Sequence, residues 1–182
     1  RKAPFWLERT RLLLGDRLER LRQAHIWVVG LGGVGGMACE SLCRAGVGQL
    51  TLVDADRVEM TNLNRQILAT RATLGRQKTD AMQERLRSIV PGVSLNLHPQ
   101  FLTSFPEELI LAHGKPDLVL DAIDSLAPKT ELILGCLERS IPVFSALGAG
   151  ARMDPSAIRS GDISETRVCP LARALRKRLH RR

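Results

Sequence analysis

The chain has 182 residues, of which 44% are hydrophobic, and this length suffices for one domain with a buried core. No apolar run approaches the length of about 20 residues that a membrane-spanning helix needs. The four cysteines form no Cys-x-x-Cys pair and no dense framework, which argues against a disulfide-rich secreted domain and predicts free thiols in the cytoplasm.

The net charge of +8 is concentrated near the end of the chain. Residues 167–182 hold seven Lys and Arg and no acid, which leaves +1 for residues 1–166. Leu171, Leu175 and Leu179 are spaced four apart, as on one face of a helix. We expect a basic helix whose apolar stripe packs on the domain, or whose cationic face binds a polyanion such as RNA. Its pattern lacks a Gly or Pro stop signal, which indicates a truncated chain.

Helical and strand patterns alternate along the rest of the chain. The expected helices cover 9–23, 33–45, 76–89, 104–112 and 128–140, and the expected strands cover 26–30, 50–54, 93–97, 117–121 and 141–144. Ser104 is the expected cap of the fourth helix, and Pro128 is expected to open the fifth. Such alternation predicts an α/β fold of the Rossmann type, a doubly wound, mainly parallel sheet with helices on both faces. We predict a nucleotide-binding domain over residues 1–166, followed by the basic segment 167–182.

The first strand–turn–helix unit carries a glycine-rich loop. Gly30, Gly32 and Gly35 satisfy G-x-G-x-x-G between an apolar strand and a helix. Glycines there let backbone amides approach phosphate, and an acid after the second strand, here Asp54, reaches ribose hydroxyls. The motif alone does not separate NAD, FAD and ATP binding, and a tight turn without a ligand is the alternative. Asp56 is either a second nucleotide contact or a turn residue that hydrogen-bonds its own backbone, and we favour the turn.

The polar loop after the second strand favours ATP among these nucleotides. It reads T-N-L-N-R-Q over residues 61–66, whereas a dehydrogenase needs an apolar slot for nicotinamide. Arg65 and Lys78 supply two cations from separate elements, as binding of a triphosphate requires. Each cation alone could be an ordinary surface residue. Together, behind a glycine loop, they favour an ATP site.

Two acids lie at the end of the strand expected at 117–121: Asp121 is its last residue, and Asp124 follows three residues later. In an open parallel sheet, ligands bind beyond the carboxyl ends of the strands. Asp124 lies outside the strand and is the candidate ligand of Mg²⁺, which bridges phosphate oxygens and keeps several waters. The alternative for Asp124 is the N-cap of the next helix. Asp121 is expected to cap or order the loop.

Five motifs occur in an order and at intervals that resemble the ThiF/MoeB/HesA superfamily, the bacterial relatives of ubiquitin-activating enzymes. They read G-L-G-G-V-G, L-V-D-A-D, T-N-L-N-R-Q, G-R-Q-K and D-A-I-D-S, and the resemblance extends from about residue 9 to the end. The superfamily adenylates carboxylates, so the resemblance implies ATP and Mg²⁺ as cofactors. The forms N-L-N-R-Q and D-A-I-D-S and the basic ending resemble most the branch that dehydrates threonylcarbamoyladenosine in the tRNA anticodon loop.

The resemblance also implies roles for the residues that match these motifs. Asp54 would bind the ribose, and Asp124 would hold Mg²⁺. In the superfamily an N-terminal arginine crosses a homodimer interface to the partner's ATP. Its counterpart here is Arg11, although residues 7–10 replace the glycine-containing turn that usually precedes it. The residues expected at the phosphates are Gly32, Gly33, Gly35, Asn62, Arg65 and Lys78, of which Arg65 and Lys78, with Arg11, would act in catalysis.

The implied reaction is attack of the threonylcarbamoyl carboxylate on the α-phosphorus of ATP, followed by ring closure with release of AMP. It requires no covalent nucleophile, so Cys136 and Cys169 are expected to be non-catalytic. The implied partners are tRNA, a second copy of the chain and a sulfur-transfer accessory protein, with no membrane required.

Three rivals remain open from the sequence. The first adenylates the C-terminal Gly-Gly of a ubiquitin-like sulfur carrier, and its relatives usually carry two Cys-x-x-Cys pairs for zinc, which this chain lacks. The others are a non-catalytic nucleotide-binding module and an NAD-dependent dehydrogenase.

Overall fold

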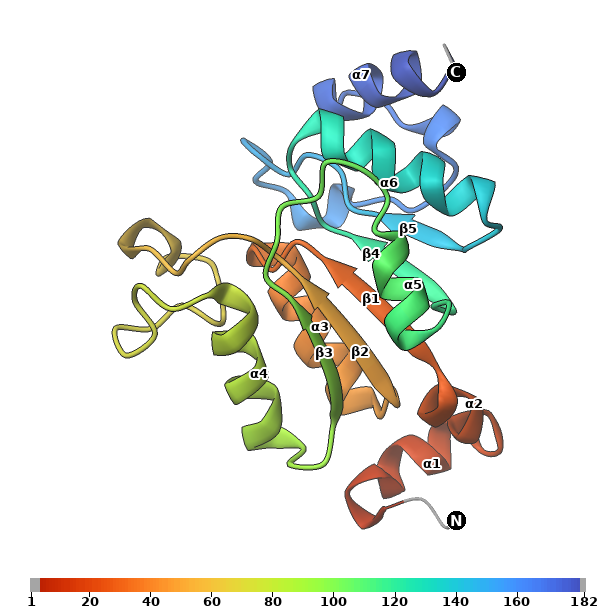
Figure 1. Ribbon diagram of the computed structural model, residues 1–182. Helices are drawn as coiled ribbons and strands as arrows, with labels where there is room; N and C mark the ends of the chain where they lie inside the picture. The colour runs from red at the N-terminus through yellow and green to blue at the C-terminus, as the bar shows by residue number, and fades with distance from the viewer. Residues whose placement is uncertain (1–3, 181–182) are drawn as a thin grey trace.

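The sheet of this protein has five parallel strands. The computed structural model describes residues 4–180. The strands are β1 (His25–Val29), β2 (Gln49–Val53), β3 (Ser94–His98), β4 (Leu118–Asp121) and β5 (Val143–Ser145). Their order is β3-β2-β1-β4-β5, and every neighbouring pair is parallel (Figure 1). The strands β2 and β3 thus follow on one side of β1 and the strands β4 and β5 on the other, as in nucleotide-binding α/β folds. The predicted fold class is confirmed.

Helices alternate with these strands along the chain. They are α1 (Glu8–Leu14), α2 (Arg17–Gln23), α3 (Gly33–Ala45), α4 (Lys78–Ile89), α5 (Glu107–His113), α6 (Leu126–Glu138) and α7 (Pro170–Leu179). Short 3-10 turns are η1 (Phe5–Leu7), η2 (Met60–Asn62), η3 (Pro155–Ala157) and η4 (Ile163–Glu165). Within residues 4–180, every helix is too short or too polar to cross a bilayer.

The central strand β1 is buried on both faces, because successive strand side chains point to opposite sides. Ile26 and Val28 join a core with α3 and α4, whereas Trp27 and Val29 join a second core with α5 and α6. Each fully buried aliphatic side chain of this kind stabilises the fold by about 1.5–3 kcal/mol. Trp27 is fully buried and stacks on Phe105, so Trp27→Ala would cost about 3–5 kcal/mol.

Several expected element boundaries were wrong. The helix expected over 9–23 is two helices, because Gly15 has φ 54° and ends α1. Ser104 does not cap α5, whose N-cap is Pro106. Pro128 does not open α6, which begins two residues earlier at Leu126; a proline in the first turn removes no helical hydrogen bond.

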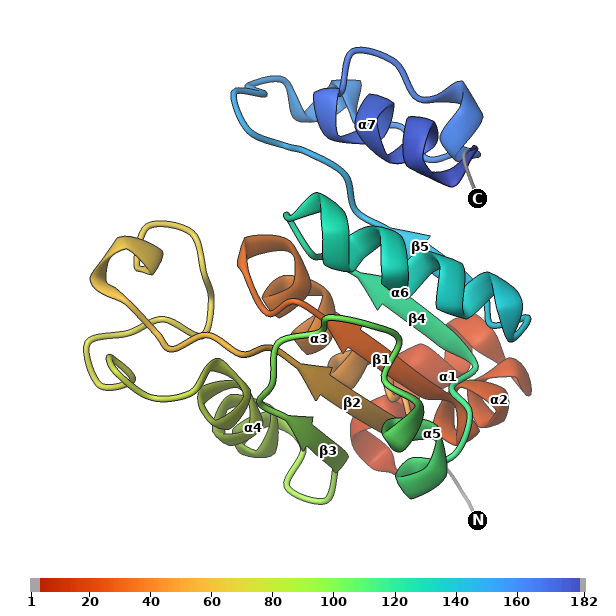
Figure 2. The same ribbon diagram turned by 45° about the horizontal axis from the view of Figure 1, so that its top comes forward.

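Helix α7 lies on the side of α6 that faces away from the sheet (Figure 2). Ala172 and Leu175 are fully buried there, so the apolar stripe of the basic segment packs on the domain. Arg173, Lys177 and Arg178 remain exposed. The apolar and cationic sides of this helix thus face different surroundings, and the cationic side is available to a partner.

Candidate nucleotide site

The glycine loop delivers free backbone amides at the carboxyl end of β1. Helix α3 begins directly after Gly32, which occupies the N-cap position and has no side chain to cap the helix. The first bond of the helix runs from the Gly36 amide to the Gly32 carbonyl at 3.0 Å. The amides of Gly33 and Gly35 come too early to have an intrahelical acceptor. An uncapped helix N-terminus with such amides is suited to bind phosphate.

The glycines of this loop have two different tasks. A Cβ on Gly35 would lie 1.7 Å from the carbonyl oxygen of Gly30, and a Cβ on Gly30 would lie 2.8 Å from that of Ala122. Gly30 also has φ 90°. These two glycines are therefore required for close backbone packing. Gly32 is different, because its nearest neighbour would be Gln66 Nε2 at 3.9 Å, which leaves room for a ligand.

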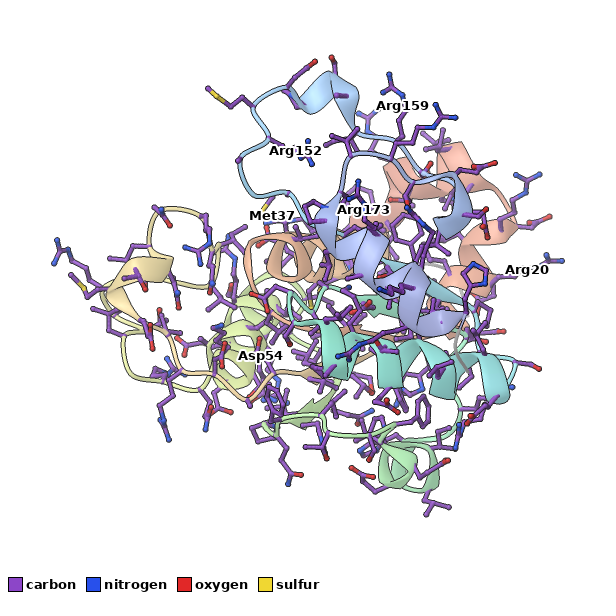
Figure 3. The ribbon with its side chains drawn as sticks, turned by 90° about the horizontal axis from the view of Figure 1, so that it is seen from above. Arg20, Met37, Asp54, Arg152, Arg159 and Arg173 are labelled. Atoms are coloured by element: carbon purple, nitrogen blue, oxygen red, sulfur yellow. The ribbon has the colours of Figure 1, made fainter. Side chains whose placement is uncertain are left out.

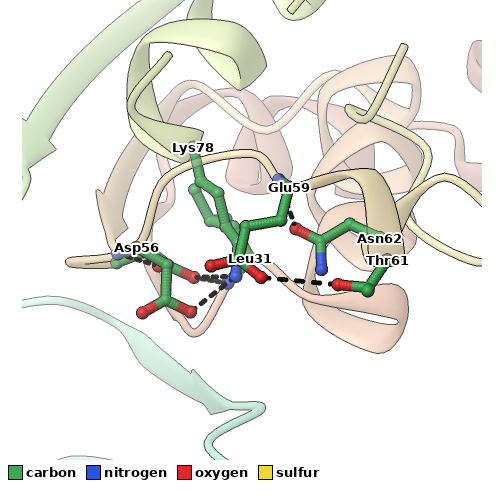
Figure 4. A network of polar contacts seen from close by, with 7 residues as sticks. Leu31, Asp56, Glu59, Thr61, Asn62 and Lys78 are labelled. Carbon is green, nitrogen blue, oxygen red and sulfur yellow. Dashed lines mark hydrogen bonds and ion pairs between the residues drawn. The ribbon is translucent and has the colours of Figure 1, made fainter. Parts of the chain in front are cut away.

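Asp54 follows β2 and holds the glycine loop in place. Its Oδ2 accepts the Leu31 amide at 2.6 Å, and its Oδ1 accepts the Asp56 amide at 2.8 Å (Figure 4). Burial raises the pKa of this carboxyl, and the two amides and Lys78 oppose that rise. Each carboxylate oxygen can accept a second hydrogen bond, so Asp54 keeps capacity for a ribose hydroxyl.

Lys78 is the first residue of α4 and is 5% exposed. Its Nζ lies 2.6 Å from Asp56 Oδ2 and 4.0 Å from Asp54 Oδ2. The interpretation of Asp56 as a residue that bonds its own backbone is wrong, because Asp54 makes the turn and the Asp56 carboxylate holds Lys78. A polyphosphate entering the site would compete with the exposed Asp56 for this ammonium group.

The loop 59–66 forms a second side of the site. Asn62 is buried, and its Oδ1 accepts the Glu59 amide at 3.0 Å in a capping box around η2 (Figure 4). Thr61 Oγ1 donates to Glu59 Oε2 at 3.4 Å. Asn62 therefore shapes the loop through its oxygen, and its side-chain amide nitrogen is the donor that could meet a phosphate.

Arg65 and Gln66 bring this loop against the glycine loop. Arg65 is exposed, and its Nη1 donates to the Thr61 carbonyl at 2.9 Å. Its Cγ would lie 3.7 Å from a Cβ on Gly33, and Gln66 lies beside Gly32 in the same way. Sequence reasoning missed Gln66, which is 6% exposed. Its only signal was its position directly after Arg65 in the motif.

The β4–α6 loop closes the third side of the site. The Asp121 carboxylate is fully buried; Oδ2 lies 2.6 Å from Lys129 Nζ and accepts Ser145 Oγ at 2.6 Å. Its Oδ1 accepts the Ile123 amide at 3.0 Å, so Asp121 orders the loop as expected. Lys129, which also donates to the Ala146 carbonyl at 2.9 Å, was missed.

Asp124 is exposed on the same loop. The N-cap of α6 is Ser125, so the alternative of Asp124 as that cap is wrong. Residues 4–180 contain no group of three His, Cys, Asp or Glu that could hold a metal ion. A single free carboxylate nevertheless suits Mg²⁺, which takes its other ligands from phosphate and water.

Arg11 is not brought to this site within the chain. Helix α1 lies near the start of β1, away from the loop that follows β2 (Figure 1). The Arg11 guanidinium donates to both carboxylate oxygens of Glu8, at 2.7 and 3.0 Å. Only a second molecule could present Arg11 to the glycine loop.

The four cysteines are free thiols. Cys39, Cys43 and Cys136 are buried, and burial raises the pKa of Cys136 to about 12. Burial would also raise the pKa of Cys169, but backbone hydrogen bonds, that from the Ala172 amide above all, lower it overall. None of them lies among the site residues described above.

These features are those of a nucleotide-binding α/β fold, with a candidate anion site at the start of α3. Residues 8–176 match the ThiF family, and the chain belongs to that family. The tRNA threonylcarbamoyladenosine dehydratase of Haemophilus influenzae is 42% identical over 171 residues, which cover 94% of this chain and 65% of that protein. The chain thus spans about two thirds of the length of this relative.

Two further comparisons bear on the nucleotide and the substrate. The crystal structure of the E. coli tRNA N6-threonylcarbamoyladenosine dehydratase in complex with ATP has a TM-score of 0.89 and 40% identity, covering 97% of this chain and 74% of that chain. The molybdopterin-synthase adenylyltransferase of E. coli is 37% identical over 139 residues, which cover 76% of this chain and 54% of that protein. The likeness to the dehydratases therefore extends over more of the chain.

Proposed function

We propose that this chain is the adenylating part of an enzyme that uses ATP to cyclise threonylcarbamoyladenosine in tRNA. The observation that carries the proposal is that two cations lie beside the glycine loop: the Arg65 side chain lies against Gly33, and Lys78 Nζ is 4.0 Å from the Asp54 carboxylate that accepts the Leu31 amide. A Cβ on Gly32 would have only Gln66 Nε2 within 4 Å, which leaves room for a phosphate, and Asp54 would bind the ribose. The ATP complex of the 40% identical dehydratase supports the same nucleotide here.

The chain's residues would act on the charges of the reaction. A carboxylate and a triphosphate repel one another, and cations and amide dipoles at the phosphates reduce that repulsion and orient the α-phosphorus. The carboxylate oxygen bonds to the α-phosphorus, and the bond to pyrophosphate breaks. The carbamoyl nitrogen then attacks the activated acyl carbon and loses a proton, and AMP leaves with the former carboxylate oxygen. The net change is removal of one water.

Asp124 is the residue we assign to Mg²⁺. It is exposed at the carboxyl end of β4, and its loop touches the glycine loop through Ala122 and Gly30. When bound, the metal ion neutralises charge on the phosphates. Asp124 itself would contribute one oxygen ligand and fix the position of the ion relative to α3.

A homodimer is part of the proposal, because Arg11 can meet a nucleotide only on another molecule. Exposed apolar side chains lie on the same two elements as Arg11, η1 and α1: Phe5 is 91%, Leu12 67% and Leu13 83% exposed, and Trp6 is 48% exposed. Exposed apolar residues that form one patch are typical of an interaction site. We assign it to a second copy of the chain.

The proposed reaction implies both the tRNA partner and the location of the enzyme. A tRNA substrate implies a cytoplasmic enzyme, and the basic residues 167–180 would face the RNA; residues 181 and 182 of the expected basic segment lie outside the described residues. A sulfur-transfer accessory protein stays an expectation of the family resemblance, and no described residue adds support for it.

The experiment that tests this function compares two substrates in a pyrophosphate-release assay with Mg·ATP. Release with threonylcarbamoylated tRNA, and none with a ubiquitin-like protein ending in Gly-Gly, is the expected result. Release only with the ubiquitin-like protein would instead establish the sulfur-carrier rival.

A second measurement distinguishes the proposed ATP-dependent enzyme from an NAD-dependent dehydrogenase and from a non-catalytic nucleotide-binding module. Calorimetry should show ATP binding and no NADH binding. Lys78→Ala should weaken ATP binding roughly 10-fold or more, because a hydrogen bond between charged groups is lost. Asp124→Ala should weaken it only when Mg²⁺ is present. Lys115→Ala, at an exposed lysine of the α5–β4 loop, is the control.

A further inference from the structure

Three buried or half-buried side chains form a closed polar network where β4, β5 and α6 meet. The Lys129 ammonium group donates to Asp121 Oδ2 at 2.6 Å and to Ser145 Oγ at 3.0 Å. It also donates to the Ala146 carbonyl at 2.9 Å. Ser145 Oγ in turn donates to Asp121 Oδ2 at 2.6 Å. A lysine has three donors, and all three are used here, so Lys129 has no donor left for a ligand.

The network extends into the loop that carries Asp124. The other carboxylate oxygen of Asp121, Oδ1, accepts the Ile123 amide at 3.0 Å. The Ala122 amide donates to the Val29 carbonyl at 2.8 Å. The two residues that precede Asp124 are thus fixed, one by the buried carboxylate and the other by β1. Lys129 reaches this loop only through Asp121, whose carboxylate it holds.

The free-energy cost of this network indicates a role beyond folding. Lys129 and Asp121 are both 0% exposed, and removing two charges from water has a cost that their attraction offsets only in part. Apolar side chains of similar volume are often at least as stable in such a position. An apolar pair would, however, tolerate small shifts of the loop. The ion pair favours one arrangement, because a shift would leave a charge buried without its partner.

We propose that Lys129 is a positioning residue for the metal ion that accompanies ATP, acting through Asp121 on the loop of Asp124. This inference rests on the proposed function, in which Asp124 supplies one oxygen ligand to Mg²⁺. A single carboxylate fixes the position of the ion only as firmly as its own loop is held. Groups that hold a metal ligand in place change metal affinity by about 10- to 100-fold when they are removed.

The test is calorimetry of ATP binding in Mg²⁺ and in EDTA, where the ratio of the two affinities is the gain due to Mg²⁺. The double variant Asp121→Leu/Lys129→Met removes both charges together, which a fold tolerates better than the removal of one. Its gain should be roughly 10-fold smaller than that of the wild type, whereas its affinity in EDTA should change less than about twofold. Ser145→Ala keeps the ion pair and loses one hydrogen bond, so it should reduce the gain by a smaller factor, at least about twofold.

Combination with Asp124→Ala separates positioning from a general loss of structure. Asp124→Ala should remove most of the gain in the wild type and should have little further effect in the double variant, because both changes disable the same ligand. An undiminished effect of Asp124→Ala in the double variant would overturn the inference, as would a wild-type gain in the double variant. A wild-type gain in Ser145→Ala would overturn it too, and this variant decides alone if the double variant does not fold.

Thr130→Val is the matched control, because Thr130 is 2% exposed on the same helix and its Oγ1 donates to the Leu126 carbonyl at 2.6 Å, outside the network. It should lower the Tm and leave the gain due to Mg²⁺ unchanged. An equal loss of gain in Thr130→Val would show that any destabilisation of α6 suffices, and would overturn the inference. A wild type that binds ATP equally in Mg²⁺ and in EDTA, or not at all, would instead overturn the proposed role of Asp124 and the inference built on it.

Discussion

The Asp54 side chain is 8% exposed at the end of β2, where its two oxygens accept the amides of Leu31 and Asp56. Burial raises its pKa, so the folded protein holds a proton on Asp54 more tightly than the unfolded chain does. Protonation of Asp54 therefore stabilises the folded state relative to the unfolded chain. This contribution is complete at pH values below the ordinary aspartate pKa. It is lost as the pH rises through the raised value.

Nucleotide affinity should follow the opposite course with pH. ATP affinity should fall as the pH decreases from neutral to about pH 4, starting above the ordinary aspartate pKa, because protonated Asp54 loses an acceptor for the ribose. Calorimetry over this range should show the decrease in the wild type. The Asp54→Asn variant should bind ATP weakly at every pH, and its affinity should not decrease further as the pH falls. An identical pH course in Asp54→Asn would show that another group titrates.

The ion pair between Lys129 and Asp121 connects β4, β5 and α6. Both side chains are fully buried, and Lys129 also donates to Ser145, the last residue of β5, and to the carbonyl of Ala146 after it. Lys129→Met should lower the free energy of unfolding by about 3–5 kcal/mol, because it leaves Asp121 charged and buried. Chemical denaturation should show this loss and partial recovery in the double variant with Asp121→Leu. A loss below about 1 kcal/mol would contradict the assigned role.

Three cations of helix α7, Arg173, Lys177 and Arg178, are exposed, whereas Arg176 donates to the Thr166 carbonyl at 2.8 Å. Arg152, Arg159 and Arg173 belong to the segment after β5, which lies outermost toward the viewer in Figure 3. Reversing Arg173, Lys177 and Arg178 to Glu should weaken tRNA binding. It should also make the slope of log K for tRNA binding against the logarithm of the salt concentration shallower by about 2–3, as expected for the loss of three phosphate contacts. Filter binding at several salt concentrations measures both quantities.

The control for α7 is reversal of three exposed arginines on α2 and α4, Arg17, Arg20 and Arg87. It should leave the salt slope unchanged, and neither triple variant should alter ATP affinity. Equal losses of tRNA binding in both triple variants would indicate a general charge effect and would reject α7 as the contact surface.

The elements were predictable because apolar periodicity and glycine position depend on local chemistry. The loop from Gly30 to Gly36 lies where strand, turn and helix patterns meet, and the structure places it there. Lys129 was not predictable, since a lysine within L-A-P-K-T-E-L-I suggests a solvated face until Asp121 is seen beside it. Asp56 was misassigned and Gln66 was missed for the same reason, because burial and pairing of polar groups depend on segments distant in sequence.

At the scale of the whole molecule, the exposed apolar surface of η1 and α1 predicts a dimer. Leu13→Glu should convert the protein to a monomer, because it buries a charge in the interface. Sedimentation equilibrium of the wild type and the variant measures this. Leu111→Glu is the control, since Leu111 is 87% exposed on a different helix, α5. A monomeric wild type, or a dimeric Leu13→Glu variant, would contradict the proposed partner.

We propose that the site formed by α3, Arg65 and Lys78 activates a carboxylate of tRNA with ATP. The most direct measurement is incubation with Mg·ATP and threonylcarbamoylated tRNA, followed by mass analysis of the nucleosides. The modified adenosine should lose the mass of one water, with one AMP and one pyrophosphate formed for each adenosine converted. A modified adenosine of unchanged mass, in a preparation shown to bind both ATP and tRNA, would contradict the claim.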